Sequence, residues 1–198
     1  MRKAIFIDKD GTLIRNVPYN VDPDKIQLEH FAIEGLRLLQ QKGYLIVVIS
    51  NQAGVAHGYF SEDALQPVIG TVRRLLADGG IRLDGFYYCP HHPAGKVEPF
   101  AASCTCRKPA PGMIIRAAID LDISLGESWM IGDILHDVEA GNRAGCQSIL
   151  INNGNETEWV INPNSRPEYI VKDLLEAATM IANHSTTNHS TWNSYIRH

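Results

Sequence analysis

The stretch Asp8-Lys9-Asp10-Gly11-Thr12 decides how this chain is interpreted, because it directly follows the apolar, β-rich run Ala4–Ile7. Two further polar segments also follow apolar runs: Ser50-Asn51-Gln52, and Gly132-Asp133 with Asp137 four residues on. In an open parallel sheet, the loops at the carboxyl ends of the strands meet at one crevice. We therefore expect these acids and hydroxyls to lie together, around a divalent cation and a phosphoryl group.

The three segments together resemble the haloacid dehalogenase superfamily, in its phosphatase branch. The resemblance covers about residues 3–152. It implies that Asp8 is the nucleophile and Asp10 the general acid/base, with Ser50 and Lys108 stabilising the transferred phosphate. It also implies that Mg²⁺ is held by Asp8, Asp10 and Asp133.

The same chemistry follows from the residue types. A carboxylate nucleophile splits one difficult displacement into two easier steps through an acyl phosphate. Cations must neutralise the repulsion between carboxylate and phosphate, and Mg²⁺ with Lys108 would do so. Asp10 would protonate the leaving alkoxide and then deprotonate water, a role worth roughly 10²–10⁴ in rate. Gly11 would allow a sharp turn, and Thr12 is expected to hydrogen-bond within that turn.

Composition bounds the class of protein. With 198 residues and 44% hydrophobic content, the chain is long enough for one buried domain. A net charge of −4 without a long basic run argues against a nucleic-acid partner. No apolar stretch reaches the roughly 20 residues that span a bilayer, and no signal-peptide segment precedes the first strand. We expect a cytoplasmic monomer, with a domain over residues 1–182, a polar tail over 183–198, and a small sugar phosphate as substrate.

Strand and helix patterns alternate along the chain, which predicts an α/β fold with a doubly wound, mainly parallel sheet. Strands are expected at residues 3–7, 44–49, 86–88, 128–131 and 148–151, with a short edge strand at 169–171. Helices are expected at residues 33–42, 111–120 and 137–144. Two more should follow N-caps at Ser61 and at Asp173, the last one ending at residue 181.

The second strong pattern is Cys89-Pro90-His91-His92, followed after eleven residues by Cys104-Thr105-Cys106. This spacing can close four ligands around a tetrahedral Zn²⁺: Cys89, His91, Cys104 and Cys106. The C-x-H spacing favours His91 over His92. A disulfide and free buried thiols are the alternatives, and a cytoplasmic compartment argues against the disulfide. Because protein fills all four positions, the zinc should be structural: it would fold the loop of residues 89–106 and position Arg107 and Lys108.

This zinc loop, ending in Cys-x-Cys-Arg-Lys-Pro and combined with the lack of a large cap, is similar to the heptose-bisphosphate phosphatase family and to histidinol-phosphatase domains. Ser50-Asn51-Gln52 and the loop length agree better with the heptose enzymes. That resemblance implies Mg²⁺-dependent removal of the C7 phosphate of D-glycero-D-manno-heptose 1,7-bisphosphate, in precursor synthesis for lipopolysaccharide or surface polysaccharide. It also implies substrate contacts from five residues: Asn16, Tyr19, Asn51, Gln52 and Arg107.

Other functions stay open at this point. Histidinol phosphate or another sugar phosphate is the alternative substrate, and a zinc-knuckle binding protein without turnover is the alternative from another class. The intact Asp8 and Asp10 weigh against the latter. Two positions depart from the family pattern. Ile134 stands where a Lys is usual, and we expect its side chain near the crevice. Lys9 replaces an Arg, and we expect its stem to pack while its charge stays in water.

Overall fold

A computed structural model of the chain describes residues 1–184 and shows one sheet of six strands, all paired in parallel. The strand order is β3-β2-β1-β4-β5-β6, so the chain winds outward in both directions from β1. This confirms the predicted doubly wound α/β fold. The strands are β1 (Ala4–Asp8), β2 (Leu45–Asn51), β3 (Gly85–Cys89), β4 (Trp129–Gly132), β5 (Gln147–Ile151) and β6 (Tyr169–Val171).

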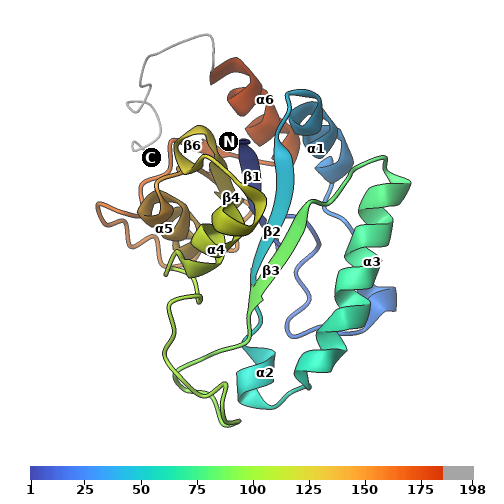
Figure 1. The fold of residues 1–198 in the computed structure, drawn as a ribbon, viewed down its shortest axis with the longest axis vertical. Coiled ribbons are helices and arrows are strands. Elements are labelled where there is room, and N and C mark those ends of the chain that lie inside the picture. Colours follow the sequence, from blue (N-terminus) through green and yellow to red (C-terminus); the bar gives the residue numbers. More distant parts are fainter. Residues whose placement is uncertain (185–198) are drawn as a thin grey trace.

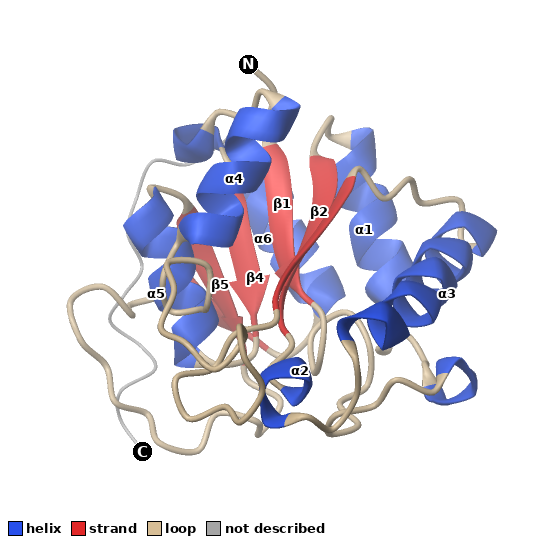
Figure 2. Cartoon of the chain, turned by 60° about the horizontal axis from the view of Figure 1, so that its bottom comes forward, coloured by secondary structure: helices blue, strands red, loops and turns tan. Residues whose placement is uncertain are grey.

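Helices cover both faces of the sheet (Figures 1 and 2). The side chains of α1, α3 and α6 share one buried cluster with one face of the strands, and those of α4 share the other cluster with the opposite face. The helices are α1 (Ala32–Gln41), α2 (Gly54–His57), α3 (Leu65–Asp78), α4 (Gly112–Leu121), α5 (Leu135–Ala144) and α6 (Leu174–His184), with short 3₁₀ turns at Pro23–Lys25, Glu62–Ala64 and Leu125–Glu127.

The central strand explains why both faces need cover. Along β1 every residue is buried. Ile5 and Ile7 pack into the cluster beneath α1, α3 and α6, while Ala4 and Phe6 pack into the cluster beneath α4. Side chains alternate between the faces of a strand, so a continuous apolar run belongs in a sheet that is covered on both sides.

Three helix boundaries differ from the predicted ones by two residues or more. The side chain of Ser61 accepts no capping hydrogen bond, and a 3₁₀ turn separates it from α3. Helix α5 begins two residues before the predicted start, because its first N–H, on Leu135, donates to the carboxylate of Glu156. Helix α6 runs to His184, into the predicted tail, and residues 185–198 lie outside the described part of the chain. The predicted cap at Asp173 is confirmed: its carboxylate accepts the N–H of Glu176 at 2.8 Å.

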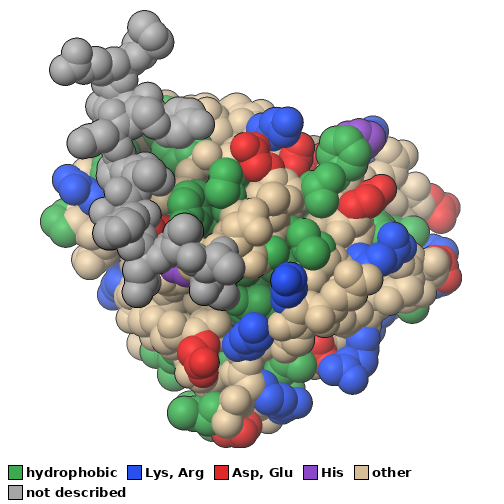
Figure 3. Space-filling model, turned by 90° about the horizontal axis from the view of Figure 1, so that it is seen from above, with side chains coloured by type: hydrophobic (Ala, Val, Ile, Leu, Met, Phe, Trp, Pro, Cys, Tyr) green, Lys and Arg blue, Asp and Glu red, His purple; other side chains and the backbone are tan. Residues whose placement is uncertain are grey.

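The carboxyl ends of the strands meet the functional loops at the lower side of Figure 2. The predicted zinc loop of residues 89–106 begins at the last residue of β3 and forms most of the connection to α4, and the described residues form no separate cap domain over the sheet. In residues 1–184 no helix is both long and apolar enough to cross a bilayer. On the face shown in Figure 3, basic and acidic side chains are interspersed.

Candidate active site and metal cluster

Three buried carboxylates meet at the carboxyl edge of the sheet. Asp8 ends β1, Asp133 follows β4, and Asp137 lies in the first turn of α5; their ligand atoms lie within 4.8 Å of one another. Burial raises the pKa of Asp8 to about 7 and that of Asp133 to about 6, and it also raises the pKa of Asp137. The sequence singled out Asp137 but gave it no role; its side chain is fully buried here.

Lys108 supplies the positive charge of this cluster. Its ammonium forms ion pairs with Asp8 and, at 2.6 Å, with Asp137, and it donates to the carbonyl of Ile49 at 3.2 Å. Burial alone would lower the pKa of Lys108, but the two carboxylates outweigh burial and raise it. The lysine therefore stays charged, at the place where a phosphoryl group next to Asp8 would need a cation.

Two donors hold Asp133. The hydroxyl of Thr12 donates to one of its oxygens at 3.1 Å, and the side-chain amide of Asn155 donates to the other at 2.6 Å. The hydroxyl of Thr12 thus bonds to the residue that follows β4, the strand beside β1, and not within its own turn as predicted. Gly11 has a φ of +90°, and a Cβ there would collide with Asp133 and Asn155. This turn therefore needs glycine both for its backbone conformation and for space.

Asp10 lies apart from the three clustered carboxylates. One of its oxygens accepts from the ammonium of Lys9 at 2.7 Å, and the other accepts from Gln52 Nε2 at 3.2 Å. The same Nε2 donates to the Ser50 hydroxyl at 2.7 Å. The expectation that the Lys9 charge stays in water is wrong: its side chain is 3% exposed, because Asp10 supplies a partner inside the protein.

A cleft of about 280 Å³ opens beside Asp10. All five predicted substrate-binding residues border it: Asn16, Tyr19, Asn51, Gln52 and Arg107. The amide of Asn51 is already engaged, since it donates to the backbone carbonyl of Lys108 at 3.2 Å and accepts the backbone N–H of Lys108 at 3.0 Å. Tyr19 is 54% exposed and packs edge-on against Tyr59, with ring centroids 4.7 Å apart.

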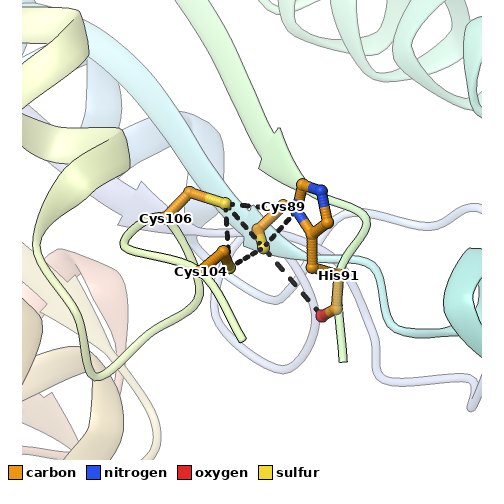
Figure 4. A group of neighbouring side chains, drawn as sticks. All are labelled: Cys89, His91, Cys104 and Cys106. Atoms are coloured by element: carbon orange, nitrogen blue, oxygen red, sulfur yellow. Dashed lines mark hydrogen bonds between the residues drawn. The ribbon is translucent and has the colours of Figure 1, made fainter. Parts of the chain in front are cut away.

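The predicted zinc ligands come together from the end of β3 and the returning loop (Figure 4). The sulfur of Cys106 lies 2.9 Å from that of Cys89 and 3.2 Å from that of Cys104, and 3.5 Å from Nδ1 of His91. All three cysteines are free thiols. The hydrogen bond between Cys89 and Cys106 lowers the pKa of Cys106 to about 5 and raises that of Cys89. Three thiols and an imidazole nitrogen fit a tetrahedral Zn²⁺.

The neighbouring His92 faces elsewhere. Its Nδ1 accepts the N–H of Ala94 at 3.1 Å, and its ring lies 4.6 Å from the ring of His57. His91 is therefore the histidine of the cluster. The cluster also reaches the cleft, because the backbone N–H of Arg107 donates to the sulfur of Cys104 at 3.4 Å.

Ile134 borders a second cleft, of about 420 Å³, between the start of α5 and residues 155–165. Its side chain is half-buried and is not part of the lining of the first cleft. Asn155 connects the second cleft to the group of buried carboxylates, since it borders that cleft and donates a hydrogen bond to Asp133.

Sequence reasoning missed the contribution of the segment after β5. Asn153 donates to the carbonyl of Gly11 at 2.6 Å, and Asn155 bonds to Asp133. The signal was present: Asn152-Asn153-Gly154-Asn155 is a polar run after a buried strand, the pattern that marked the three segments used above.

Comparison with known proteins identifies relatives across most of the chain. A family model described as HAD-hydrolase-like matches residues 105–177. The D-glycero-beta-D-manno-heptose-1,7-bisphosphate 7-phosphatase of Pasteurella multocida (strain Pm70) is 44% identical over 151 residues, which are 76% of this chain and 82% of that protein. The protein of the same name from Salmonella typhi is 39% identical over 168 residues, 80% of this chain and 89% of its own length.

A solved structure agrees with this match. The D,D-heptose 1,7-bisphosphate phosphatase from B. bronchiseptica, complexed with magnesium and phosphate, superimposes with a TM-score of 0.77 and 29% identity, covering 92% of this chain and 99% of that one. Fold and relatives define the class of protein: it is a phosphoric monoester hydrolase, a phosphatase of the haloacid dehalogenase type. Within that class, the chain belongs to the D-glycero-beta-D-manno-heptose-1,7-bisphosphate 7-phosphatase family. The resemblance seen in the sequence is thereby confirmed.

Proposed function

We propose that this phosphatase removes the C7 phosphate of D-glycero-β-D-manno-heptose 1,7-bisphosphate with the help of Mg²⁺. The observation that carries the proposal is the buried group of Asp8, Asp133, Asp137 and Lys108 at the carboxyl edge of the sheet, in a chain whose Asp10 and Arg107 border a cleft. The names of the relatives supply the substrate and its β anomer.

The charges of the site support Mg²⁺ as the cofactor. Three buried carboxylates face one ammonium, that of Lys108, which leaves two negative charges for a divalent cation to neutralise. Carboxylate oxygens are the ligands that Mg²⁺ prefers. Asp8 and Asp133 would hold it, and Thr12 with Asn155 would keep Asp133 oriented. Asp10 is the third predicted Mg²⁺ ligand. Its two carboxylate oxygens accept hydrogen bonds from Lys9 and from Gln52, and they would have to give up these bonds to bind the metal. The bound cation would neutralise charge on the phosphoryl oxygens.

In the first step, a carboxylate oxygen of Asp8 attacks phosphorus, and the bond between phosphorus and the sugar O7 breaks. Asp10 gives its proton to O7, so that the sugar leaves as an alcohol. The phosphoryl group is then an aspartyl phosphate on Asp8. Lys108 lies against Asp8 and offers positive charge to the phosphoryl oxygens, and the Ser50 hydroxyl donates to them.

In the second step, a water molecule attacks the phosphorus of the aspartyl phosphate. Asp10, now ionised, takes a proton from that water, and the bond to Asp8 breaks to release inorganic phosphate. Asp10 returns to its protonated form and Asp8 to its ionised form. Asp10 serves both steps because its carboxyl borders the cleft from which sugar leaves and water enters.

The cysteine cluster would hold a structural Zn²⁺ and act through geometry. Cys106 precedes Arg107 and Lys108 in the chain, and Cys104 accepts a hydrogen bond from the Arg107 backbone. A metal that fixes Cys104 and Cys106 thereby fixes where the cation of Lys108 and the substrate-facing Arg107 lie.

We also propose that the protein acts in the cytoplasm as a monomer, in the synthesis of heptose precursors for lipopolysaccharide or surface polysaccharide.

A phosphate-release panel tests the substrate. It compares kcat/KM for heptose 1,7-bisphosphate (both anomers), other sugar phosphates and histidinol phosphate, with Mg²⁺ present. We expect the β-heptose bisphosphate to be preferred and Asp8→Asn to abolish release from every ester, because an amide is not an anionic nucleophile. A preference for histidinol phosphate would replace the proposed substrate. Full activity in Asp8→Asn would reject the mechanism.

A further inference from the structure

Gln52 occupies the junction between the cysteine cluster and the phosphate-handling residues. It follows β2 directly and is 8% exposed. Its backbone N–H donates to the carbonyl of Cys89 at 2.8 Å, and its backbone carbonyl accepts the N–H of Val55 at the start of α2. The backbone of Gln52 is therefore fixed on both sides, which fixes the origin of its side chain.

Both hydrogens of the Gln52 amide are used within the protein. Nε2 donates to the hydroxyl of Ser50 at 2.7 Å and to the carboxylate of Asp10 at 3.2 Å. The Asp10 oxygen that faces the amide accepts this hydrogen bond, and only the nitrogen of the amide can donate it. A side-chain NH₂ group has two hydrogens, and neither is left to donate to a substrate.

The hydrogen bond from Gln52 to Ser50 determines the direction in which the Ser50 hydroxyl points its hydrogen. The Ser50 oxygen accepts from Gln52, and within residues 1–184 its hydroxyl hydrogen has no protein acceptor. The hydroxyl is completely buried at the end of β2. Since its acceptor side is occupied by Gln52, the O–H is left to donate to a phosphoryl oxygen.

The hydrogen bond from Gln52 also restrains the carboxyl group of Asp10, which is not part of the group formed by Asp8, Asp133 and Asp137. Lys9 holds one oxygen and Gln52 holds the other. Lys9 alone would leave the carboxyl group free to rotate about that one bond. The two donors together hold the general acid at the border of the cleft.

We propose that Gln52 is a positioning residue, whose side-chain NH₂ group orients the Ser50 hydroxyl and the Asp10 carboxyl and does not donate to the substrate. The proposal rests on the proposed function, since it assigns Asp10 and Ser50 their roles. It predicts that loss of the amide lowers kcat and leaves KM nearly unchanged, because the affected contacts act on the transferring phosphoryl group and the leaving oxygen.

The test uses the full-length, metal-loaded protein and three variants. Gln52→Met keeps the length of the side chain but removes both donors. Gln52→Glu keeps the shape and places an acceptor against Asp10. Gln66→Met is the matched control, since Gln66 is exposed on α3. Kinetics are measured with heptose bisphosphate and with p-nitrophenyl phosphate, whose leaving group departs without a proton.

We expect kcat for the sugar phosphate to fall about 10- to 100-fold in Gln52→Met and further in Gln52→Glu, with KM within about 3-fold of wild type. The loss should be smaller for the aryl ester, because its departure needs no general acid. A rise in KM with unchanged kcat would overturn the proposal, and so would equal activity in Gln52→Glu and wild type. If wild type cleaves the aryl ester but not the heptose ester, the proposed substrate fails instead. In that case, the relative kcat values of wild type, Gln52→Met and Gln52→Glu on the aryl ester still test the role of Gln52.

Discussion

The ammonium of Lys108 lies 2.6 Å from the carboxylate of Asp137, in a pair that is almost completely buried. Lys108 follows the zinc loop of residues 89–106, and Asp137 lies in the first turn of α5. Lys108 also contacts Asp8, so one cation connects the proposed nucleophile to the helix behind it. Removing it would leave buried carboxylates without their counter-charge.

We therefore predict that Lys108→Met lowers the free energy of unfolding by about 3–5 kcal/mol at pH 8 in the presence of a chelator. The loss should be smaller at pH 5. Burial already raises the pKa of Asp8 to about 7, and without the lysine the pKa rises further, so the folded protein takes up protons as the pH falls and avoids the unpaired charge. Urea unfolding at the two pH values measures this, with the exposed Lys42→Met as control. Equal losses at both values would contradict the explanation.

The hydrogen bonds to Asp133 predict a metal phenotype. Asn155→Ala should raise the Mg²⁺ concentration needed for half-maximal activity by about 10- to 100-fold, as is usual when an outer partner of a metal ligand is removed. Saturating Mg²⁺ should restore most of kcat, since Asn155 touches no reacting atom. Asn152→Ala is the control, because the hydrogen bond of Asn152 is made by its backbone. An unchanged Mg²⁺ requirement would show that Thr12 alone holds Asp133.

Binding of Mg²⁺ should depend on pH. The pKa of Asp8 is raised to about 7 and that of Asp133 to about 6, so both carboxyls must lose protons before they can bind a cation. We expect Mg²⁺ to bind about 20-fold more weakly at pH 6 than at pH 8. Calorimetry in two buffers of different ionisation enthalpy should detect released protons. The dependence should flatten in Asp8→Asn; a flat profile in wild type would contradict the raised pKa values.

Much of this site could be predicted from sequence because it follows one rule. Asp8 and Ser50 lie at the carboxyl ends of β1 and β2, Asp133 directly follows β4, and parallel strands end at the same edge. The zinc ligands could be predicted for a different reason, because the spacing of metal ligands is a local property of the chain. These ligands are Cys89, His91, Cys104 and Cys106.

What the sequence did not reveal depends on where side chains turn. Nothing local indicates that the Lys9 ammonium folds back onto Asp10, or that Glu156 caps a helix 21 residues earlier in the chain. The amide of Asn51 looked available for substrate, but the structure shows it paired with the backbone of Lys108. The contacts of Glu156 and Asn51 join segments far apart in sequence, and the contact between the neighbours Lys9 and Asp10 depends on how the Lys9 side chain turns, so no periodicity or spacing records them.

For the cysteine cluster, we predict about one zinc per chain, retained through a gel-filtration step that removes Mg²⁺. Cys106→Ser should lose that zinc and lower kcat/KM, because Arg107 and Lys108 follow directly in the chain. Cys146→Ser is the matched control: this buried thiol lies outside the cluster, and burial raises its pKa to about 12. Elemental analysis and kinetics are measured on the same samples. Zinc-free wild-type protein with a Cys104–Cys106 disulfide would contradict the assignment.

The proposed removal of the C7 phosphate is tested most directly by ³¹P NMR of D-glycero-β-D-manno-heptose 1,7-bisphosphate incubated with the protein and Mg²⁺. We expect the C7 phosphate signal to be converted to that of inorganic phosphate, while the anomeric phosphate remains on the sugar. In a parallel sample, Asp8→Asn should leave both signals unchanged. Loss of the anomeric phosphate, or release of the C7 phosphate by Asp8→Asn, would contradict the proposal.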